Sequence, residues 1–223
     1  MKVTKRIVAM TACAIMSVSS MVSVYTSATE MNCNDNGLVK VCDDYSTMAL
    51  SSAHYNELKI TGYPQENSYW CWVACTKTIL KYLKVSPLPS QTEIYKTAKG
   101  VDKAENKQGN FTEIKKAISA YAKKEFTTST KPSFNNISDA IRYDKIVIVR
   151  GLKENSTEGH DLVVYAFDEN KDDGSYVLKI YDPDSNEGGD GTLTCEKGTN
   201  TTYTWTVGEK SKTFTATNYM YGK

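Results

Sequence analysis

Apolar side chains recur at helical spacing in the segment that follows residue 70. Four of them lie three or four positions apart, which places them on one face of an α-helix. They are Trp72, Cys75, Ile79 and Leu83. The prolines of segment 87–89 cannot continue a helix. The pattern therefore predicts a helix of about fifteen residues, long enough to belong to the core.

The chain reaches this helix through an extended segment. Tyr63 precedes Pro64, and a residue before proline avoids the helical region of backbone conformation. Short polar side chains accept hydrogen bonds from the free N–H groups at a helix start. We therefore predict that the helix begins near Trp70 and that Asn67 or Ser68 caps it.

Three shorter helices are predicted downstream. Each begins with a polar residue that is followed three positions later by an acidic one, and in the first two this is a capping box. Gly100 provides the stop signal of the first. The three pairs are Ser90 with Glu93, Asn110 with Glu113, and Asn136 with Asp139.

From residue 145 onward the pattern changes from helical to extended. The segments 145–152, 160–168 and 175–182 are rich in β-branched and aromatic residues and are bounded by Gly, Asn or Asp. Short polar linkers between them suit hairpin turns. Further strands are predicted at 192–195, 202–207 and 212–219. Helices followed by antiparallel strands predict an α+β domain.

Composition supports a soluble globular domain behind a leader. The 223 residues are 40% hydrophobic and 24% charged. Three basic residues near the N terminus precede a run of apolar and small residues that ends in a small-residue cleavage pattern at 26–28. We predict a signal peptide at 1–28, an N-terminal arm or short pro-segment at 29–58, and one domain at 59–223. The protein is expected to be secreted.

Charge excludes some partners. Removing the leader removes three basic residues and no acidic ones, which leaves 24 basic and 26 acidic residues and a formal charge of −2. The lysines are scattered among acids without a basic block, so a nucleic-acid partner is not expected. We expect a monomer without stable membrane association once the leader is removed.

Five cysteines follow the leader, and an odd number leaves one thiol unpaired in an oxidising compartment. If Cys71 is the free thiol, three connectivities remain. The simplest pairs Cys33 with Cys42, which closes a short loop, and Cys75 with Cys195. The other two remain open.

Cys71 has the context of a reactive thiol. It lies at the predicted helix start, where negative charge is favoured. A thiol needs a base, and the mature chain offers two histidines. His54 lies in the polar arm, whereas His160 opens a strand directly after a turn, so His160 is the better candidate. Cys75, inside the helix, is the weaker candidate for the nucleophile.

Two more residues complete the candidate site. Asp182 ends the strand that follows the one begun by His160, and antiparallel pairing brings a strand start beside the end of its neighbour. Asp161 points to the opposite face from His160 and cannot serve. Gln65, six positions before Cys71, is a candidate donor to an oxyanion. Asp184 and Asn186 are the reserves for Asp182.

These residues resemble a known family. The pattern is similar to that of the papain-like cysteine peptidases. A Gln is followed six positions later by a Cys and then directly by a Trp, and a distant His at a strand start precedes an Asp-Pro at the end of the next strand. The likeness is to compact bacterial forms resembling the double-glycine leader peptidases and secreted effector proteases, and it spans about residues 60–186.

The resemblance implies a fold and a set of roles. Helices, the longest of which starts at the catalytic Cys, would pack on a C-terminal antiparallel sheet. Cys71 would be the nucleophile, His160 the base and acid, Asp182 the group that orients His160, and Gln65 the oxyanion donor. Where many relatives have Asn, this chain has Asp182, and no transmembrane segment follows the leader.

The expected function is hydrolysis of peptide bonds in a protein or peptide substrate. An acyl transferase, deamidase or amidase could use the same residues, and a non-catalytic secreted binding module could keep the same fold. No cofactor is expected. No metal is expected either, because no CxxC pair accompanies Cys71 and Cys75.

Overall fold

The helix that begins the candidate site is α2 (Cys71–Tyr82), observed in a computed structural model that describes residues 54–169, 174–196 and 201–223. It has 12 residues, fewer than predicted, and ends with a backbone bond from Leu83 N–H to the carbonyl of Ile79. Its N-cap is Trp70, and no side chain caps it. The predicted cap by Asn67 or Ser68 is wrong, because these residues form the turn before the helix.

The next two helices follow the predicted start signals. Both α3 (Gln91–Lys99) and α4 (Phe111–Ala122) begin with complete capping boxes, and α3 ends at Gly100 in the left-handed conformation. The fourth helix, α5 (Phe134–Arg142), begins earlier than predicted. Ser133 is its cap, and Asn136 donates its backbone N–H to the Ser133 hydroxyl. The predicted start at Asn136 is wrong, because the helix begins at Phe134 and Asn136 already lies within it.

The strands form a closed barrel. In chain order its strands are β3 (Ile146–Lys153), β4 (His160–Glu169), β5 (Ser175–Asp182), β6 (Gly189–Glu196), β7 (Thr202–Val207) and β8 (Lys210–Gly222). Every neighbouring pair is antiparallel. Each strand pairs with the next, and β8 returns to pair with β3. The antiparallel topology is as predicted, whereas the closure into a barrel by this last pairing was not predicted.

Two short strands extend the sheet outside the barrel. β1 (Tyr55–Glu57) pairs with β4 and lies in the segment predicted to be an arm, and β2 (Thr127–Ser129) pairs with β8. Neither was predicted, since three-residue strands carry too little pattern to detect.

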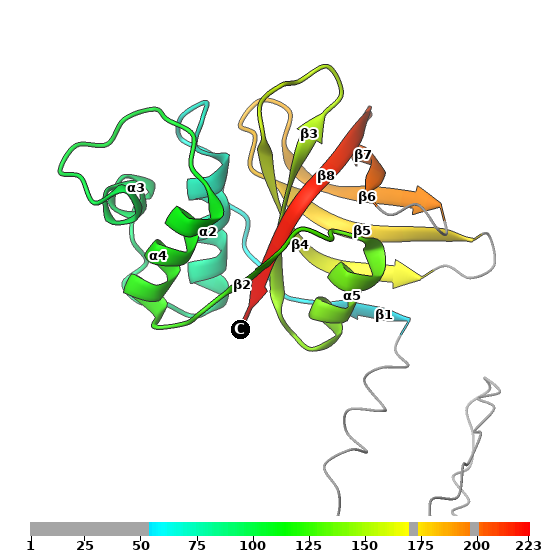
Figure 1. Cartoon of the computed structure of the whole chain (residues 1–223), viewed down its shortest axis with the longest axis horizontal. Helices are drawn as coiled ribbons and strands as arrows, with labels where there is room; N and C mark the ends of the chain where they lie inside the picture. The colour runs from blue at the N-terminus through cyan, green and yellow to red at the C-terminus, as the bar shows by residue number, and fades with distance from the viewer. Residues whose placement is uncertain (1–53, 170–173, 197–200) are drawn as a thin grey trace, which may run out of the picture. The chain divides into compact units, whose positions relative to one another are not determined.

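Figure 1 shows α2, α3 and α4 together on one side of the barrel, and α5 against it elsewhere. The large fully buried side chains include Trp72 in the helical part and Trp205 and Phe214 in the barrel. Helix α2 contacts both the other two helices and β4. Helix α2, which begins at Cys71, therefore packs against both the other two helices and the barrel.

The predicted disulfide between Cys75 and Cys195 does not form. Cys75 lies on α2, where its Sγ donates to the carbonyl oxygen of Asp161, whereas Cys195 lies on β6 opposite Tyr176 of β5. The predicted signal peptide and the predicted Cys33–Cys42 pair lie outside the described residues. Among the residues described, no helix is both long and apolar enough to cross a membrane.

Candidate active site

Cys71 is the first residue of α2, and its thiol lies at a cavity of about 290 Å³. It is 8% exposed, so the thiol is largely shielded from solvent but accessible from the cavity. The first N–H groups of a helix have no partners within the helix, and the helix dipole favours negative charge there. This is a position that favours a thiolate.

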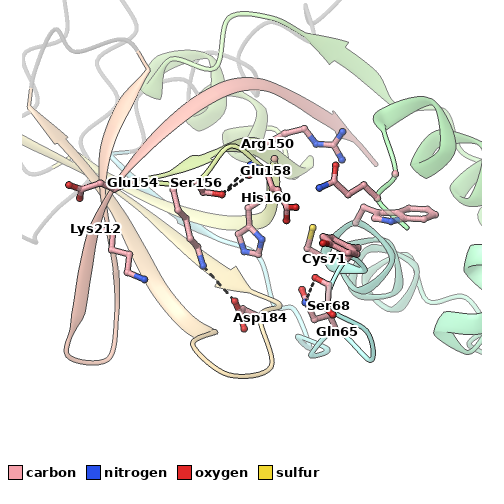
Figure 2. A pocket seen from close by; sticks show the side chains of 16 residues that line it. Gln65, Ser68, Cys71, Arg150, Glu154, Ser156, Glu158, His160, Asp184 and Lys212 are labelled. Atoms are coloured by element: carbon pink, nitrogen blue, oxygen red, sulfur yellow. Dashed lines mark hydrogen bonds and ion pairs between the residues drawn. The ribbon is translucent and has the colours of Figure 1, made fainter. Parts of the chain in front are cut away.

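His160, the first residue of β4, faces Cys71 across the cavity (Figure 2). Nε2 of the imidazole is hydrogen-bonded to Oδ1 of Asp182 at 2.7 Å, and Cys71 lines the cavity on the other side of the ring. Since Nε2 is engaged by Asp182, the nitrogen toward Cys71 is Nδ1. The ring therefore lies between a thiol and a carboxylate.

Asp182 is fully buried at the end of β5. The register of β4 and β5 pairs Val163 with Tyr181, and one further step sets Asp182 opposite Leu162, on the face that also carries His160. The predicted meeting of a strand start and a strand end is thus observed. Asp184, a reserve candidate, instead donates its backbone N–H to Asp182.

Four donors converge on the carboxylate of Asp182. Oδ1 accepts from His160 Nε2 and from the Asp184 N–H at 2.9 Å. Oδ2 accepts from Trp205 Nε1 at 3.0 Å and from Lys153 Nζ at 2.9 Å. Both oxygens of this buried carboxylate have hydrogen-bond donors, and Lys153 and the protonated His160 also bring positive charge. The carboxylate can therefore stay ionised in the interior.

The pKa of each partner responds to this network. Burial alone lowers the pKa of His160, but the hydrogen bonds with Asp182 and Cys71 and their charges outweigh it and raise the pKa to about 10. Burial alone raises the pKa of Asp182, but its bonds and charge interactions with His160 and Lys153 hold that pKa well below its ordinary value. The protonated imidazole and ionised carboxylate are thus the favoured pair at neutral pH.

Gln65 lies in the turn before α2 and lines the same cavity (Figure 2). Its Nε2 donates to the carbonyl oxygen of Ser68 at 2.9 Å, and its backbone N–H donates to the carbonyl oxygen of Pro183 at 2.7 Å. The second bond ties the loop before Cys71 to the turn that follows Asp182. One N–H of the Gln65 amide remains to serve a ligand in the cavity.

The weaker candidates lie away from this arrangement. Cys75 is fully buried, does not line the cavity, and burial raises the pKa of its thiol well above the ordinary value. His54 lies beside Glu169, at the far end of β4 from His160. Nine strand residues separate the two ends, about 30 Å. Of the two histidines, His160 alone is near Cys71.

Gln108 and Gly109, at the end of segment 105–109, form one wall of the cavity, and sequence reasoning did not assign them to it. The indole N–H groups of Trp70 and Trp72 donate to the carbonyl oxygens of Glu105 and Lys107 at 2.9 and 3.1 Å. A Cβ added to Gly109 would lie 2.4 Å from the Trp72 ring, so only glycine fits. The two tryptophans flanking Cys71 therefore hold this wall beside it.

Three charged residues of β3 and β4 were also missed. Lys153 contacts Asp182, as described, and Arg150 forms a two-point pair with Asp161 at 2.7 and 2.5 Å. Asp161 is fully buried and Arg150 lines the cavity. A charged residue within a strand was the available signal, since an inward position there needs a partner. Within the described part of the chain, no cluster of His, Cys, Asp and Glu could hold a metal ion.

One family model and two solved structures resemble this chain. The model of the Peptidase C39-like family matches residues 57–211. A solved structure of a proposed C39-like peptidase from Bacillus anthracis aligns with a TM-score of 0.44 and 10% identity, over 66% of this chain and 90% of that one. UfSP from C. elegans aligns with a TM-score of 0.41 and 13% identity, over 75% of this chain and 34% of that one. No curated protein matches the chain.

Proposed function

Because this chain belongs to the peptidase C39-like family of papain-like cysteine peptidases, we propose that it hydrolyses peptide bonds with Cys71 as nucleophile. The observation that carries the proposal is the place of His160, whose ring faces Cys71 across the cavity and is hydrogen-bonded to Asp182 on its other side. A thiol, an imidazole and an orienting carboxylate in this order are the parts that nucleophilic acyl transfer requires.

The first half of the reaction forms an acyl-enzyme. His160 already holds the proton given up by the Cys71 thiol, and the thiolate attacks the carbonyl carbon of the scissile peptide bond. The oxyanion that develops accepts hydrogen bonds from the free N–H of the Gln65 amide and from the backbone N–H of Cys71 at the helix start. His160 then donates its proton to the leaving amine, and a thioester to Cys71 remains.

The second half releases the acid product. A water molecule takes the place of the amine, His160 accepts a proton from it, and the resulting hydroxide attacks the thioester. Collapse of the second oxyanion expels the Cys71 thiolate, and His160 again holds a proton. Asp182 orients the imidazole and supports its charge throughout.

The test is cleavage of a defined mixture of synthetic peptides, followed by mass spectrometry. We expect new termini at discrete bonds, and in water enriched in ¹⁸O each new carboxyl group should carry the label. Cys71→Ala and His160→Ala should abolish cleavage, whereas Cys75→Ala should retain it. Transfer of the acyl group to an added amine with no ¹⁸O in the product would contradict hydrolysis and support an acyl transferase.

Labelling of the thiol gives a second, substrate-free readout. An epoxide inhibitor of cysteine peptidases should modify Cys71 in the folded protein, and Cys71→Ala should remain unmodified. Modification of Cys75 instead would contradict the assignment of the nucleophile.

We also propose that residues 1–28 direct export and are removed, so that the peptidase acts outside the cell as a monomer. N-terminal sequencing of protein recovered from the culture medium tests this. A first residue near position 29 is expected, and retention of the intact leader on cell-associated protein would contradict it.

A further inference from the structure

Lys153 shares the carboxylate of Asp182 with His160. Its Nζ lies 2.9 Å from Oδ2, while His160 binds Oδ1 at 2.7 Å. The ammonium also lies 4.4 Å from the centre of the Trp205 ring, and the Lys153 side chain is 13% exposed. Trp205 in turn donates its indole N–H to the same Oδ2. Lys153 is thus held on the far side of the carboxylate by an ion pair and a cation–π contact.

Two cations on one carboxylate influence each other. A positive charge near an imidazolium favours loss of the imidazolium proton, whereas Asp182 favours its retention. When His160 is neutral, Asp182 would be a buried carboxylate without a cationic partner if Lys153 were absent. With Lys153 in place, the carboxylate stays paired in both protonation states of His160.

This matters most in the second half of the reaction, so the inference rests on the proposed function. At the acyl-enzyme stage the Cys71 thiolate has been consumed, and His160 must be neutral to accept a proton from water. A carboxylate with no second cation would hold the imidazolium proton too tightly for that step.

We propose that Lys153 is a positioning residue that keeps Asp182 paired when His160 loses its proton, and so makes His160 available as the base for hydrolysis of the acyl-enzyme. Lys153 acts through Asp182 and does not touch the reacting atoms. The proposal predicts a change in the basicity of His160, not only in the stability of the fold.

Other ionisable groups also face His160 or Asp182 and remain the same in every comparison below. Arg150 and Asp161 neutralise each other through their two-point pair. Among the described residues these groups include Cys71 and Cys75 on α2, Arg150 on β3, Glu154 and Glu158 between β3 and β4, Asp161 on β4, Tyr181 on β5 and Asp184 after it. Lys212 on β8 also lines the cavity and changes only in its own control variant.

The decisive experiment is an NMR titration of the imidazole C–H signals. The sequence has two histidines, and exposed His54 serves as an internal reference. The titration uses the full chain with Cys71→Ala, so that the thiol does not titrate together with the ring. Comparing this parent with Cys71→Ala/Lys153→Met isolates the lysine, and a His54→Gln variant assigns the signals.

We expect Lys153→Met to raise the pKa of His160 by between about one and two units, since Lys153 lies on the other oxygen of the same carboxylate and its charge acts at an effective dielectric of about 20. Lys153→Arg should restore the parent value. Lys212→Met is the matched control, because Lys212 also lines the cavity but pairs with Glu187. An unchanged or lowered pKa of His160 in Lys153→Met would overturn the proposal.

Two further measurements keep the test decisive. If Lys153→Met is poorly folded, Lys153→Gln, which keeps a polar side chain, replaces it in the same titration.

The kinetic test uses the enzyme that retains Cys71. Lys153→Met should lower kcat for a cleaved peptide about tenfold at pH 7. Acyl-enzyme should accumulate, while the rate of its formation should change little. If Lys153→Met lowered the rate of acylation more than the rate of deacylation, the assigned step would be overturned. Failure of all cleavage would refute the peptidase but leave the titration result standing.

Discussion

Replacing Asp182 by Asn tests whether four donors require a carboxylate at this position. The four are His160 Nε2, the Asp184 N–H, Trp205 Nε1 and Lys153 Nζ. An amide has one oxygen and one NH₂ group, so it satisfies the donors on one side only. In either orientation of the amide, its NH₂ group replaces a carboxylate oxygen and faces two donors, which then have no acceptor.

The cost follows from burial. Removing one member of a buried ion pair costs about 3–5 kcal/mol, because the other charge is left without a partner. Lys153 is 13% exposed and gains some solvent screening, so we take the lower end, about 3 kcal/mol. His160 also loses the acceptor that orients its ring. Loss of such an acceptor lowers kcat/KM by about 10²- to 10⁴-fold.

Urea unfolding and peptide cleavage measure the two effects separately. The double variant Asp182→Asn/Lys153→Met should regain about 1–2 kcal/mol of unfolding free energy, since the unpaired ammonium is gone, while its activity stays low. If Asp182→Asn unfolds within about 0.5 kcal/mol of the parent and the double variant is no more stable, the carboxylate is not holding these donors.

Three further predictions address other parts of the site. Gln65→Ala should lower kcat by about 10²- to 10³-fold in a cleavage assay with little effect on thermal unfolding, and a change in stability alone would contradict an oxyanion role. Gly109→Ala should destabilise by about 1–3 kcal/mol in urea because its Cβ would meet Trp72 at 2.4 Å, whereas Gly159→Ala, where the nearest atom is 3.6 Å away, should unfold like the parent. Because the pKa of His160 rises from 6.5 to about 10 on folding, its contribution to stability is complete below pH 6.5 and is lost as pH rises toward 10. The decline, at most about 5 kcal/mol, should be absent from unfolding curves of His160→Gln, and equal slopes for both proteins would refute it.

Local signals predicted the parts of the fold that depend on neighbouring residues. The capping boxes at Ser90 and Asn110 involve a side chain and a backbone group three residues apart, so both were predicted from sequence. The approach of His160 to Asp182 was equally accessible, because β4 and β5 are consecutive and antiparallel. Adjacent hairpin strands leave few arrangements to choose from.

Long-range and partner-dependent features were not predictable in the same way. Pairing of β3 with β8 closes the barrel across more than sixty residues of chain, and no local pattern specifies it. Lys153, after a strand and beside two polar residues, has the sequence context of a solvated lysine. Its role depends on Asp182 and Trp205, which reach it only in the closed barrel.

The pairing of β8 with β3 also determines when the thiol can become reactive. The helix carrying Cys71 is made of local contacts and can form early, but the indole of Trp205 lies on β7, which pairs with β8. About 140 residues separate Cys71 from the start of β8, and their synthesis takes on the order of 10 s. During that interval Cys71 can lie at a helix start without the completed barrel that places Trp205 on Asp182. The proposed site is therefore incomplete until β8 has joined the barrel.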